Sequence, residues 1–307
     1  MTLLAERNPH PLDGLVSFQA EHGHNYFYSP TGDRVRVSVT TVVKPFFDTF
    51  DAKKVATRGV PKWMQDESSK YFGLCQYLKR VKQLSDEAIV DEICKVWTET
   101  GNAAAAAGTE MHRLLELHLQ LQLPKTEPLP HACRCFDEML GWWFPDQQLE
   151  PWRTEFPIVL IVDDVVVCAG TIDLIMRSKT TGRIFIIDYK RVDVKKKGLL
   201  GKRKAGAFRP DDATGFFRNY EASDFAKYSA QLLGYRFCLT RGGYFTEDQI
   251  AGCWLVQMHD DLPRAHVVEA NTDEAFEEAV DMMMEAEIAA AKREAREARE
   301  AREAREE

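Results

Sequence analysis

The chain has 307 residues, of which 45% are hydrophobic, and a formal net charge of −8 at pH 7. This length and composition predict a globular protein with a sizeable core, and the acidic balance excludes a protein that coats nucleic acid over its whole surface. No apolar run approaches the ~18 residues of a membrane span and polar residues interrupt the N-terminus early, so we expect an intracellular protein that is not secreted, in the cytoplasm, the nucleus or a virus-infected cell.

Up to residue 143 the sequence predicts a hairpin and then helices. Alternating aromatic and β-branched residues on either side of residues 30–33 predict a β-hairpin. Apolar residues at helical spacing predict helices within 51–100. The Ala- and Leu-rich segment 101–123 predicts another helix, ended by Pro124, and a short helix is expected over 131–143.

After residue 153 the pattern changes to strands. A helix is predicted over 223–239, where the apolar spacing is again helical. Strands are predicted over 154–162, 165–177, 183–190, 250–258 and 264–270. This order predicts a mixed α/β fold, with a central mixed β-sheet flanked by helices.

The C-terminal segment "REAREAREAREAREE" repeats Glu-Ala-Arg without an apolar stripe, so it cannot bury a face against a core. Its composition favours an exposed helix. Two uses stay open for this tail: a solvated helix, and a helix that binds a protein partner.

The seven cysteines are odd in number and scattered, which favours reduced thiols in a core over a disulfide framework. Cys133 and Cys135 are the only close pair, and no second pair accompanies them, as a zinc or iron–sulfur site would need. We expect no metal role for these two thiols.

The strand over 183–190 ends in Asp188, Tyr189 and Lys190, where a turn residue is the ordinary choice. Asp188 and Lys190 share a face because strand side chains alternate. A turn centred near Thr180 and Thr181 sets Asp173 opposite Asp188, with Cβ atoms about 4.5–5.5 Å apart unless a bulge shifts the register. Two carboxylates that close repel unless a cation lies between them, and hard oxygen ligands suit Mg²⁺.

Lys190 is then expected beside the cation, where its ammonium can polarise a water or stabilise charge on a phosphate. The tripeptide alone is also compatible with a solvated Asp–Lys pair at a strand end. His112, with Glu116 one helical turn later, is placed to reach this site or to serve a structural role. Gln231 and Tyr235, spaced i,i+4, predict either contacts to a phosphate or base, or a polar helix edge.

Four motifs in this order carry a resemblance: Gly108-x-x-x-His112, Gly170-x-x-Asp173, Asp188-x-Lys190 and Gln231-x-x-x-Tyr235. Over residues 108–240 they resemble the PD-(D/E)XK nuclease superfamily, and most of all its RecB-type exonuclease branch, which includes the mitochondrial genome maintenance exonucleases. "SVTT" at 38–41 also resembles a segment that precedes the nuclease core in phage and mitochondrial-type members.

The resemblance implies a restriction-endonuclease-like core and a set of roles. Asp173, Asp188 and the backbone carbonyl of Tyr189 would bind Mg²⁺ or Mn²⁺, with His112 as a further ligand. Lys190 would be the catalytic lysine, and Gln231 and Tyr235 would support the site and contact DNA. By the same resemblance Glu155 is a further supporting candidate, and Ser38 and Thr40 would contact nucleic acid. An iron–sulfur cluster is not expected, because the cysteine trio that some members carry after the Gln-Tyr helix is missing.

Residues 190–204 hold eight Lys or Arg in fifteen positions. Phosphate contact, a nuclear localisation signal and a solvated loop all remain open for this segment. The candidate phosphate-binding side chains are Lys195, Lys196, Lys197, Lys202, Arg203 and Lys204. The aromatics that follow predict either stacking on unpaired bases or core packing: Phe208, Phe216, Phe217 and Tyr220.

The expected function is that of a metal-dependent DNase, most of all a single-stranded DNA exonuclease of replication, repair or recombination. A structure-specific endonuclease and a non-cleaving DNA-binding module on the same fold are the alternatives. The expected divisions are a DNA-contacting hairpin and helical region (1–100), the nuclease core (101–275) and the charged tail (276–307).

Overall fold

The computed structural model describes residues 3–19, 25–47, 50–122, 129–143, 145–202 and 212–306. The chain forms two compact units: unit 1 comprises Met1–Asp48 and Met111–Glu307, and unit 2 comprises Thr49–Glu110. These limits differ from the predicted boundaries at 100 and 275. Among the described residues, no helix combines the length and hydropathy that crossing a membrane requires.

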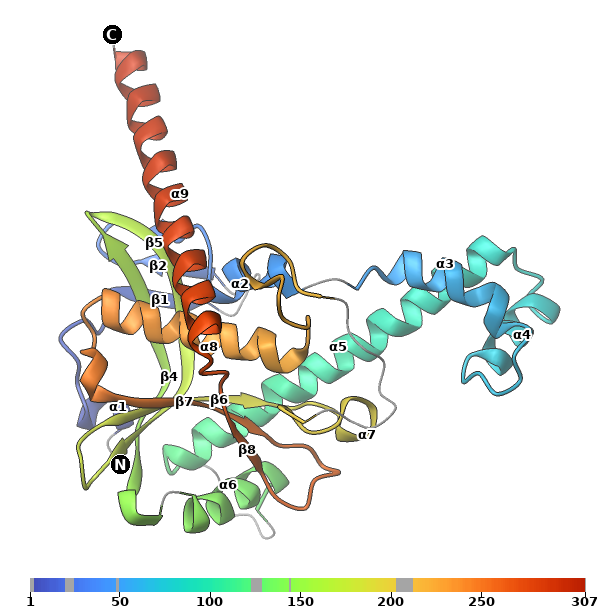
Figure 1. Ribbon diagram of the computed structural model, residues 1–307, viewed down its shortest axis with the longest axis horizontal. Helices are drawn as coiled ribbons and strands as arrows, with labels where there is room; N and C mark the ends of the chain where they lie inside the picture. The colour runs from blue at the N-terminus through green and yellow to red at the C-terminus, as the bar shows by residue number, and fades with distance from the viewer. Residues whose placement is uncertain are drawn as a thin grey trace. The chain divides into compact units, whose positions relative to one another are not determined.

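Unit 1 is built around a five-stranded sheet of order β4-β5-β6-β7-β8 (Figure 1). Neighbouring strands are antiparallel except β6 and β7, which are parallel. The mixed α/β fold with a central mixed sheet is therefore confirmed. The strands are β4 (Leu149–Val162), β5 (Val165–Ser178), β6 (Ile184–Lys190), β7 (Ile250–Gln257) and β8 (His266–Glu269).

Helices cover both faces of this sheet. One core cluster joins the sheet to α2 (Val39–Phe47), α8 (Asp224–Arg241) and α9 (Glu274–Glu306). A second cluster joins it to α6 (His131–Trp142) and to the unit 1 part of α5 (Asp86–Leu119). Because both faces are covered, Ile184–Tyr189 of β6 are all buried, which explains the uninterrupted apolar run before Asp188.

Helix α5 and several short elements complete the fold. Apart from two helices of unit 2, with 12 and 9 residues, the short elements have two to four residues each. The long helix α5 is continuous where the sequence predicted two helices; Gly101 lies inside it, at a cost of about 1 kcal/mol relative to alanine. The other elements are α1 (Leu4–Arg7), β1 (Val16–Gln19), β2 (Asn25–Tyr28), β3 (Asp33–Arg34), α3 (Ala52–Trp63), α4 (Phe72–Arg80), η1 (Pro145–Gln147), α7 (Val194–Lys197), η2 (Gly215–Phe217) and η3 (Glu247–Gln249).

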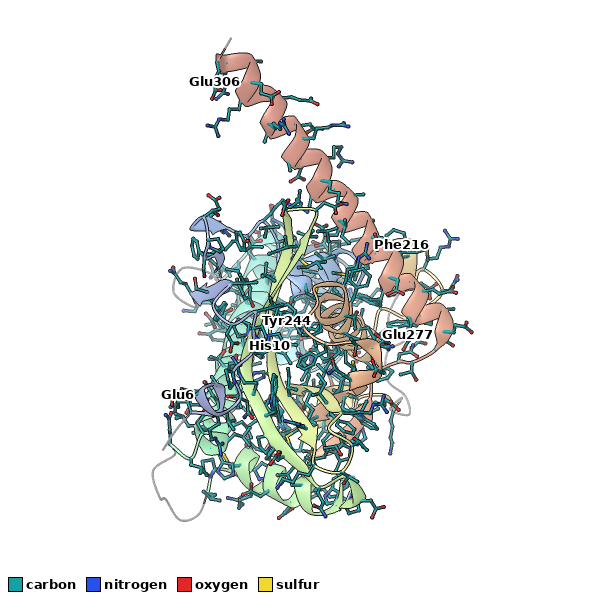
Figure 2. The ribbon with its side chains drawn as sticks, turned by 90° about the vertical axis from the view of Figure 1, so that its left-hand side faces the viewer. Glu6, His10, Phe216, Tyr244, Glu277 and Glu306 are labelled. Atoms are coloured by element: carbon teal, nitrogen blue, oxygen red, sulfur yellow. The ribbon has the colours of Figure 1, made fainter. Side chains whose placement is uncertain are left out.

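The N-terminal hairpin packs on the main sheet. Strands β2 and β3 flank the predicted turn and pair antiparallel. Val16 and Val35 share a buried cluster with Val159 of β4 and Ala169 of β5. The ring of His10 stacks on that of Tyr244 with centroids 5.3 Å apart, and both lie together in Figure 2. Residues 3–19 and 25–47 therefore belong with the sheet in unit 1, so the predicted division 1–100 is not a single unit.

The last helix is half core and half solvated. Its first turns bury Phe276, Met284 and Ile288, so the predicted boundary at 275 cuts through packed structure. The Glu-Ala-Arg repeat that follows is exposed up to Glu306 at the free end (Figure 2), as predicted. Arg299 and Glu303 pair at 2.8 Å, four residues apart.

Helix α8 approaches β5 closely at Gly170. A Cβ atom on Gly170 would lie 2.5 Å from the Cε1 atom of Tyr235, so only glycine leaves room for the ring. The glycine of one predicted motif and the tyrosine of another are thus parts of one contact. All seven cysteines are free, and only Cys94 of them is not buried.

Gly170→Ala should destabilise the protein by about 1–3 kcal/mol, because the added methyl group overlaps a buried ring. Urea unfolding measures this change. The control is Gly141→Ala in α6, where a Cβ meets nothing within 4 Å and the free energy of unfolding should rise by up to about 1 kcal/mol. Equal effects of the two substitutions would contradict the role of the close contact.

Candidate active site

The site begins where β5 and β6 part. The two strands pair Leu174 with Ile187 and Ile175 with Ile186, the register that the sequence predicted. Asp173 and Asp188 occupy the next step, just past the last paired residues. There Tyr189 donates its backbone N–H to Asp173 Oδ2 at 2.8 Å. The Asp173 carboxylate thus takes the place of a backbone carbonyl acceptor and holds the end of β6 in place.

Glu155 of β4 lies level with Asp173. The β4–β5 pairs Thr154–Leu174 and Phe156–Ile172 flank this position. Glu155 has φ of 45°, a left-handed conformation that is rare for a side chain larger than glycine within a strand. Such backbone costs about 1–3 kcal/mol and is concentrated at functional sites. Sequence reasoning gave this residue only a supporting role.

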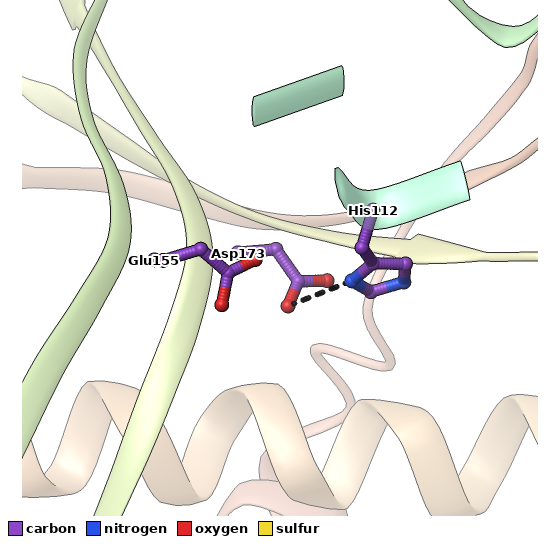
Figure 3. Close-up of side chains that lie close together, drawn as sticks. All are labelled: His112, Glu155 and Asp173. Carbon is purple, nitrogen blue, oxygen red and sulfur yellow. Dashed lines mark ion pairs between the residues drawn. The ribbon is translucent and has the colours of Figure 1, made fainter. Parts of the chain in front are cut away.

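His112, near the C-terminal end of α5, completes a compact group with these two carboxylates. Its Nδ1 lies 3.4 Å from Asp173 Oδ1, and its Nε2 lies 3.1 Å from the carbonyl oxygen of Tyr189. His112, Glu155 and Asp173 each offer a ligand atom within 4.8 Å of the others (Figure 3). One helix and two strands therefore supply a set of three donors.

The crowding of acids changes the protonation of this group. Burial by itself would lower the pKa of His112, but the Asp173 and Asp188 carboxylates outweigh it and raise that pKa to about 9. Burial, and next the charge of Asp173, raises the pKa of Glu155 to about 8. The positive charge of His112 therefore compensates Asp173, whereas Glu155 is held where its charge is unfavourable.

Asp188 faces the other side of the site. Its Oδ2 lies 2.6 Å from Lys190 Nζ, and its Oδ1 accepts a hydrogen bond from Gln231 Nε2 at 3.2 Å. Burial raises the pKa of Asp188 to about 6, against the lowering effect of Lys190. Lys190 Nζ also lies over the ring of Tyr228, 4.6 Å from its centroid. The lysine is thus fixed between a carboxylate and an aromatic face.

A relay of hydrogen bonds leads from Asp188 to α2. Gln231 Nε2 also donates to the hydroxyl oxygen of Tyr235 at 3.1 Å. The Tyr235 hydroxyl in turn has a hydrogen bond with the side chain of Thr40. Ser38 instead caps α2, since its Oγ accepts the backbone N–H of Thr41 at 3.2 Å. Of the two N-terminal candidates, Thr40 connects to the site and Ser38 positions its helix.

The donor set suits a hard divalent cation. Carboxylate oxygens and a backbone carbonyl are the ligands that Mg²⁺ prefers, and imidazole extends the range to Mn²⁺. Within the described residues the Glu155 carboxylate accepts no hydrogen bond, whereas Asp188 Oδ2 is paired with Lys190. The Glu155 oxygens are available to a cation, so the residues fit one.

The structure brings together seven of the predicted residues, and it adds Glu155 to the donors. Asp188 is turned toward Lys190 and is not among the three donors that lie closest together. The seven predicted residues are His112, Asp173, Asp188, Tyr189, Lys190, Gln231 and Tyr235.

The predicted basic side chains are described only in part. Lys195 pairs with Asp261 at 2.6 Å and is 74% exposed, a solvated ion pair that a phosphate can displace. Lys202 is exposed. The side chains of Lys196 and Lys197, and residues Arg203 and Lys204, lie outside what the structure describes.

The aromatic residues after the basic loop divide between the two predicted uses. Phe217 is fully buried, and Tyr220 packs on Phe276 with centroids 4.9 Å apart. Phe216 remains 38% exposed. Phe208 lies outside the described residues. Core packing therefore accounts for two of the four.

Sequence reasoning missed Gln257, a fully buried side chain next to Lys190 in the sheet. Its Oε1 accepts from Leu200 N at 2.8 Å, and its Nε2 donates to the carbonyl oxygens of Val192 and Gly198, both at 3.1 Å. One side chain thus holds both ends of the segment 192–200 that carries Lys195. The only signal in the sequence was a polar residue at the end of the apolar run of β7.

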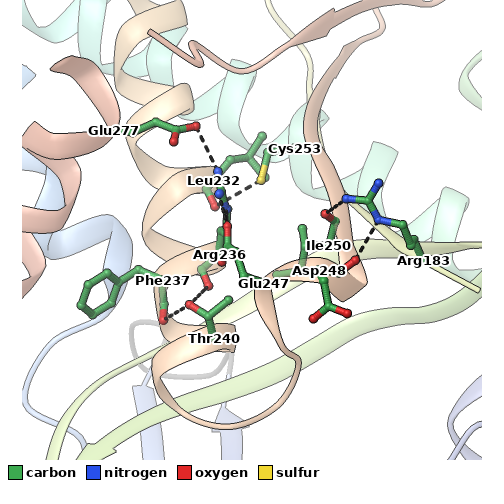
Figure 4. Close-up of polar contacts among 10 residues, drawn as sticks. All are labelled: Arg183, Leu232, Arg236, Phe237, Thr240, Glu247, Asp248, Ile250, Cys253 and Glu277. Atoms are coloured by element: carbon green, nitrogen blue, oxygen red, sulfur yellow. Dashed lines mark hydrogen bonds and ion pairs between the residues drawn. The ribbon is translucent and has the colours of Figure 1, made fainter. Parts of the chain in front are cut away.

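Arg236 fixes the far side of α8, away from the carboxylates. It donates to Glu277 of α9 at 3.0 Å and pairs with Glu247 of η3 (Figure 4). A cavity of about 390 Å³ lies beside it, lined by this network and by Leu233, Phe237 and Val280. None of the candidate site residues lines this cavity, so we assign it no part in the chemistry.

Comparison with known proteins adds little. No protein-family model and no curated protein matches the chain. A solved structure described as the crystal structure of SSO0001 is similar over 76% of this chain and 84% of that one, at 13% identity and a TM-score of 0.24. A likeness this weak carries no argument about function.

Gln257→Leu should loosen the segment 192–200, because two carbonyl groups and one N–H lose their buried partner, at about 1–3 kcal/mol each. Hydrogen exchange measured by mass spectrometry should show faster exchange there. Gln249→Leu, which removes an exposed glutamine with one local bond, is the control. Unchanged exchange in 192–200 would mean that other contacts hold it.

Glu155→Gln should stabilise the protein at high pH in EDTA. The pKa of Glu155 is raised from 4.5 to about 8 on folding, so the wild type loses stability as pH rises from 4.5 to 8, and the glutamine variant does not. The two free energies of unfolding should therefore separate by on the order of a few kcal/mol by pH 8. A gap that is constant with pH would contradict the burial of this charge.

Proposed function

We propose that the protein is a metal-dependent DNase that hydrolyses phosphodiester bonds, acting most of all from an end of single-stranded DNA in replication, repair or recombination. One observation carries the proposal: Asp173, Asp188 and Lys190 meet where β5 and β6 part, with His112 and Glu155 beside them. Three acidic side chains, an imidazole and a lysine at the point where two inner strands part fit phosphoryl chemistry better than a structural ion pair.

Asp173, Glu155, His112 and the Tyr189 carbonyl would hold Mg²⁺ or Mn²⁺, with Asp188 turning from Lys190 to join them. When bound, such a cation supplies positive charge at a phosphate oxygen and lowers the pKa of a water. The ligands come from β4, β5, β6 and α5, so their spacing depends on the rigid sheet rather than on loops.

The chain's own residues would then orient the reacting groups. Lys190 lies 2.6 Å from Asp188, so its ammonium can hold a water near the carboxylates and stabilise charge that develops on the phosphate. Gln231 fixes Asp188 by the 3.2 Å hydrogen bond, and Tyr235 fixes Gln231. Thr40, at the first turn of α2, has a hydrogen bond with Tyr235 and would contact the DNA strand.

We propose DNA as the substrate because of the resemblance to the PD-(D/E)XK nuclease superfamily. The proposed preference for a free DNA end rests on the resemblance to its RecB-type exonuclease branch. The basic segment 190–204 supports a polyanionic substrate, because lysines that neutralise phosphates release counterions and strengthen binding at low salt. The Lys195–Asp261 pair is exposed, so a phosphate can replace Asp261 at little cost.

Purified protein should degrade a labelled single-stranded oligonucleotide with Mg²⁺ or Mn²⁺ and not with EDTA. Asp188→Asn and Lys190→Ala should each lower the rate at least about 100-fold, as expected when one charge at a phosphoryl site is removed. Lys179→Ala, an exposed lysine paired with Glu150, is the matched control and should keep the wild-type rate.

Three outcomes separate the alternatives. Cleavage of circular single-stranded DNA would indicate an endonuclease, since an obligate exonuclease leaves it intact. Salt-dependent binding without cleavage of any DNA or RNA would indicate a binding module. Wild-type rates in both variants would falsify the site assignment.

A further inference from the structure

Unit 2 carries a cluster of four aromatic rings: Phe50, Trp63, Tyr71 and Trp97. Their centroids are 4.6 Å apart for Trp63 and Tyr71, 5.9 Å for Tyr71 and Trp97, and 5.5 Å for Phe50 and Trp97. Trp97 Nε1 also donates to the Tyr71 hydroxyl at 2.7 Å. None of the four is fully buried, and Phe50, at the end of the cluster, is 68% exposed.

The cluster is built rigidly. A Cβ atom on Gly59 would lie 2.2 Å from the Trp63 ring, so the indole lies directly on the backbone of its own helix, α3. Trp63, Tyr71 and Trp97 also pack on a buried apolar cluster that includes Val60 and Ile89. The exposed ring of Phe50 therefore rests on fixed neighbours.

The cations of unit 2 are concentrated in residues 50–85, whereas residues 86–99, which include Trp97, hold five Asp or Glu and one Lys. Residues 50–85 hold eight Lys or Arg and three Asp or Glu, and α3 itself has four cations and no acid. Lys54, Arg58 and Lys62 are exposed and follow one another at four-residue spacing, so they form one stripe with a rise of about 6 Å per step. Lys53 has its own partner, Asp91, at 3.5 Å.

We propose that this surface, made of the stripe Lys54–Arg58–Lys62 and the exposed ring of Phe50, binds single-stranded nucleic acid. Unpaired bases stack on Phe50 at the end of the ring cluster, and the stripe contacts the backbone phosphates. Exposed aromatics beside a row of cations are what sequence-tolerant binding of single strands requires. A duplex fits less well, since its bases are already stacked on one another.

The inference deepens the proposed function and rests on it for the role of the strand as substrate. Binding can nevertheless be measured without the reaction. Neither Phe50 nor the stripe belongs to the candidate active site, so substitutions here leave the carboxylates and Lys190 unchanged.

The test uses the full chain in EDTA and fluorescence anisotropy with an oligo(dT) strand of about 16 nucleotides. Phe50→Ala should weaken binding about tenfold, the loss expected for one stacked base. A strand of the same length made of abasic units should bind about as weakly to the wild type. Tyr77→Ala is the control, because Tyr77 is an exposed aromatic of unit 2 outside the cluster, and it should bind as the wild type does.

Replacing Lys54, Arg58 and Lys62 with glutamine should reduce the slope of log affinity against log salt by about 2, the change expected for three phosphate contacts to a single strand. The proposal is overturned if Phe50→Ala binds like Tyr77→Ala, if abasic and oligo(dT) strands bind equally, or if the slope is unchanged. Binding that follows these expectations without cleavage in Mn²⁺ would support the surface and overturn the nuclease.

Discussion

The packing of three acidic side chains against His112 and Lys190 is the constraint on which the candidate site depends. Glu155, Asp173 and Asp188 come from three adjacent strands and gather where β5 and β6 part. Acids this close need positive charge, and α5 and β6 provide it as His112 and Lys190. A core built only for stability would gain more from apolar residues at these positions. The proposed function therefore rests on this arrangement.

Successive layers of contacts keep these charges in place. The buried apolar run of β6 fixes the strand that carries Asp188 and Lys190. On one side, Gly170 admits the Tyr235 ring, so α8 can carry Gln231 within hydrogen-bond distance of Asp188. Behind α8, Arg236 pairs with Glu247 and Glu277 and holds the helix against η3 and α9. A displacement anywhere along this series would move the carboxylate and lysine together.

Local pattern was enough to predict the strands, the β5–β6 register and the Asp173–Asp188 step, because one short turn determines that hairpin. It was not enough for Glu155. Counting back from the turn at Asp163–Asp164 would set Thr154 opposite Asp173. An irregularity beside Leu160 leaves Val167 unpaired and shifts the register by one residue, so Glu155 lies opposite Asp173 instead. Nor could periodicity show that Gln257 binds a loop, or that the N-terminal hairpin packs on the sheet, since both depend on contacts distant in sequence.

The acidic net charge and the proposed polyanionic substrate are compatible because the cations are concentrated. Two segments carry most of the local excess: residues 50–85, with the stripe on α3, and the segment 190–204 after Lys190. Elsewhere acids predominate and repel phosphates, so on the proposed function a nucleic-acid strand would gain binding energy mainly at those two segments. A uniformly basic protein would bind nucleic acid in many orientations. Concentrating the cations in two segments would instead favour a few orientations of a bound nucleic-acid strand.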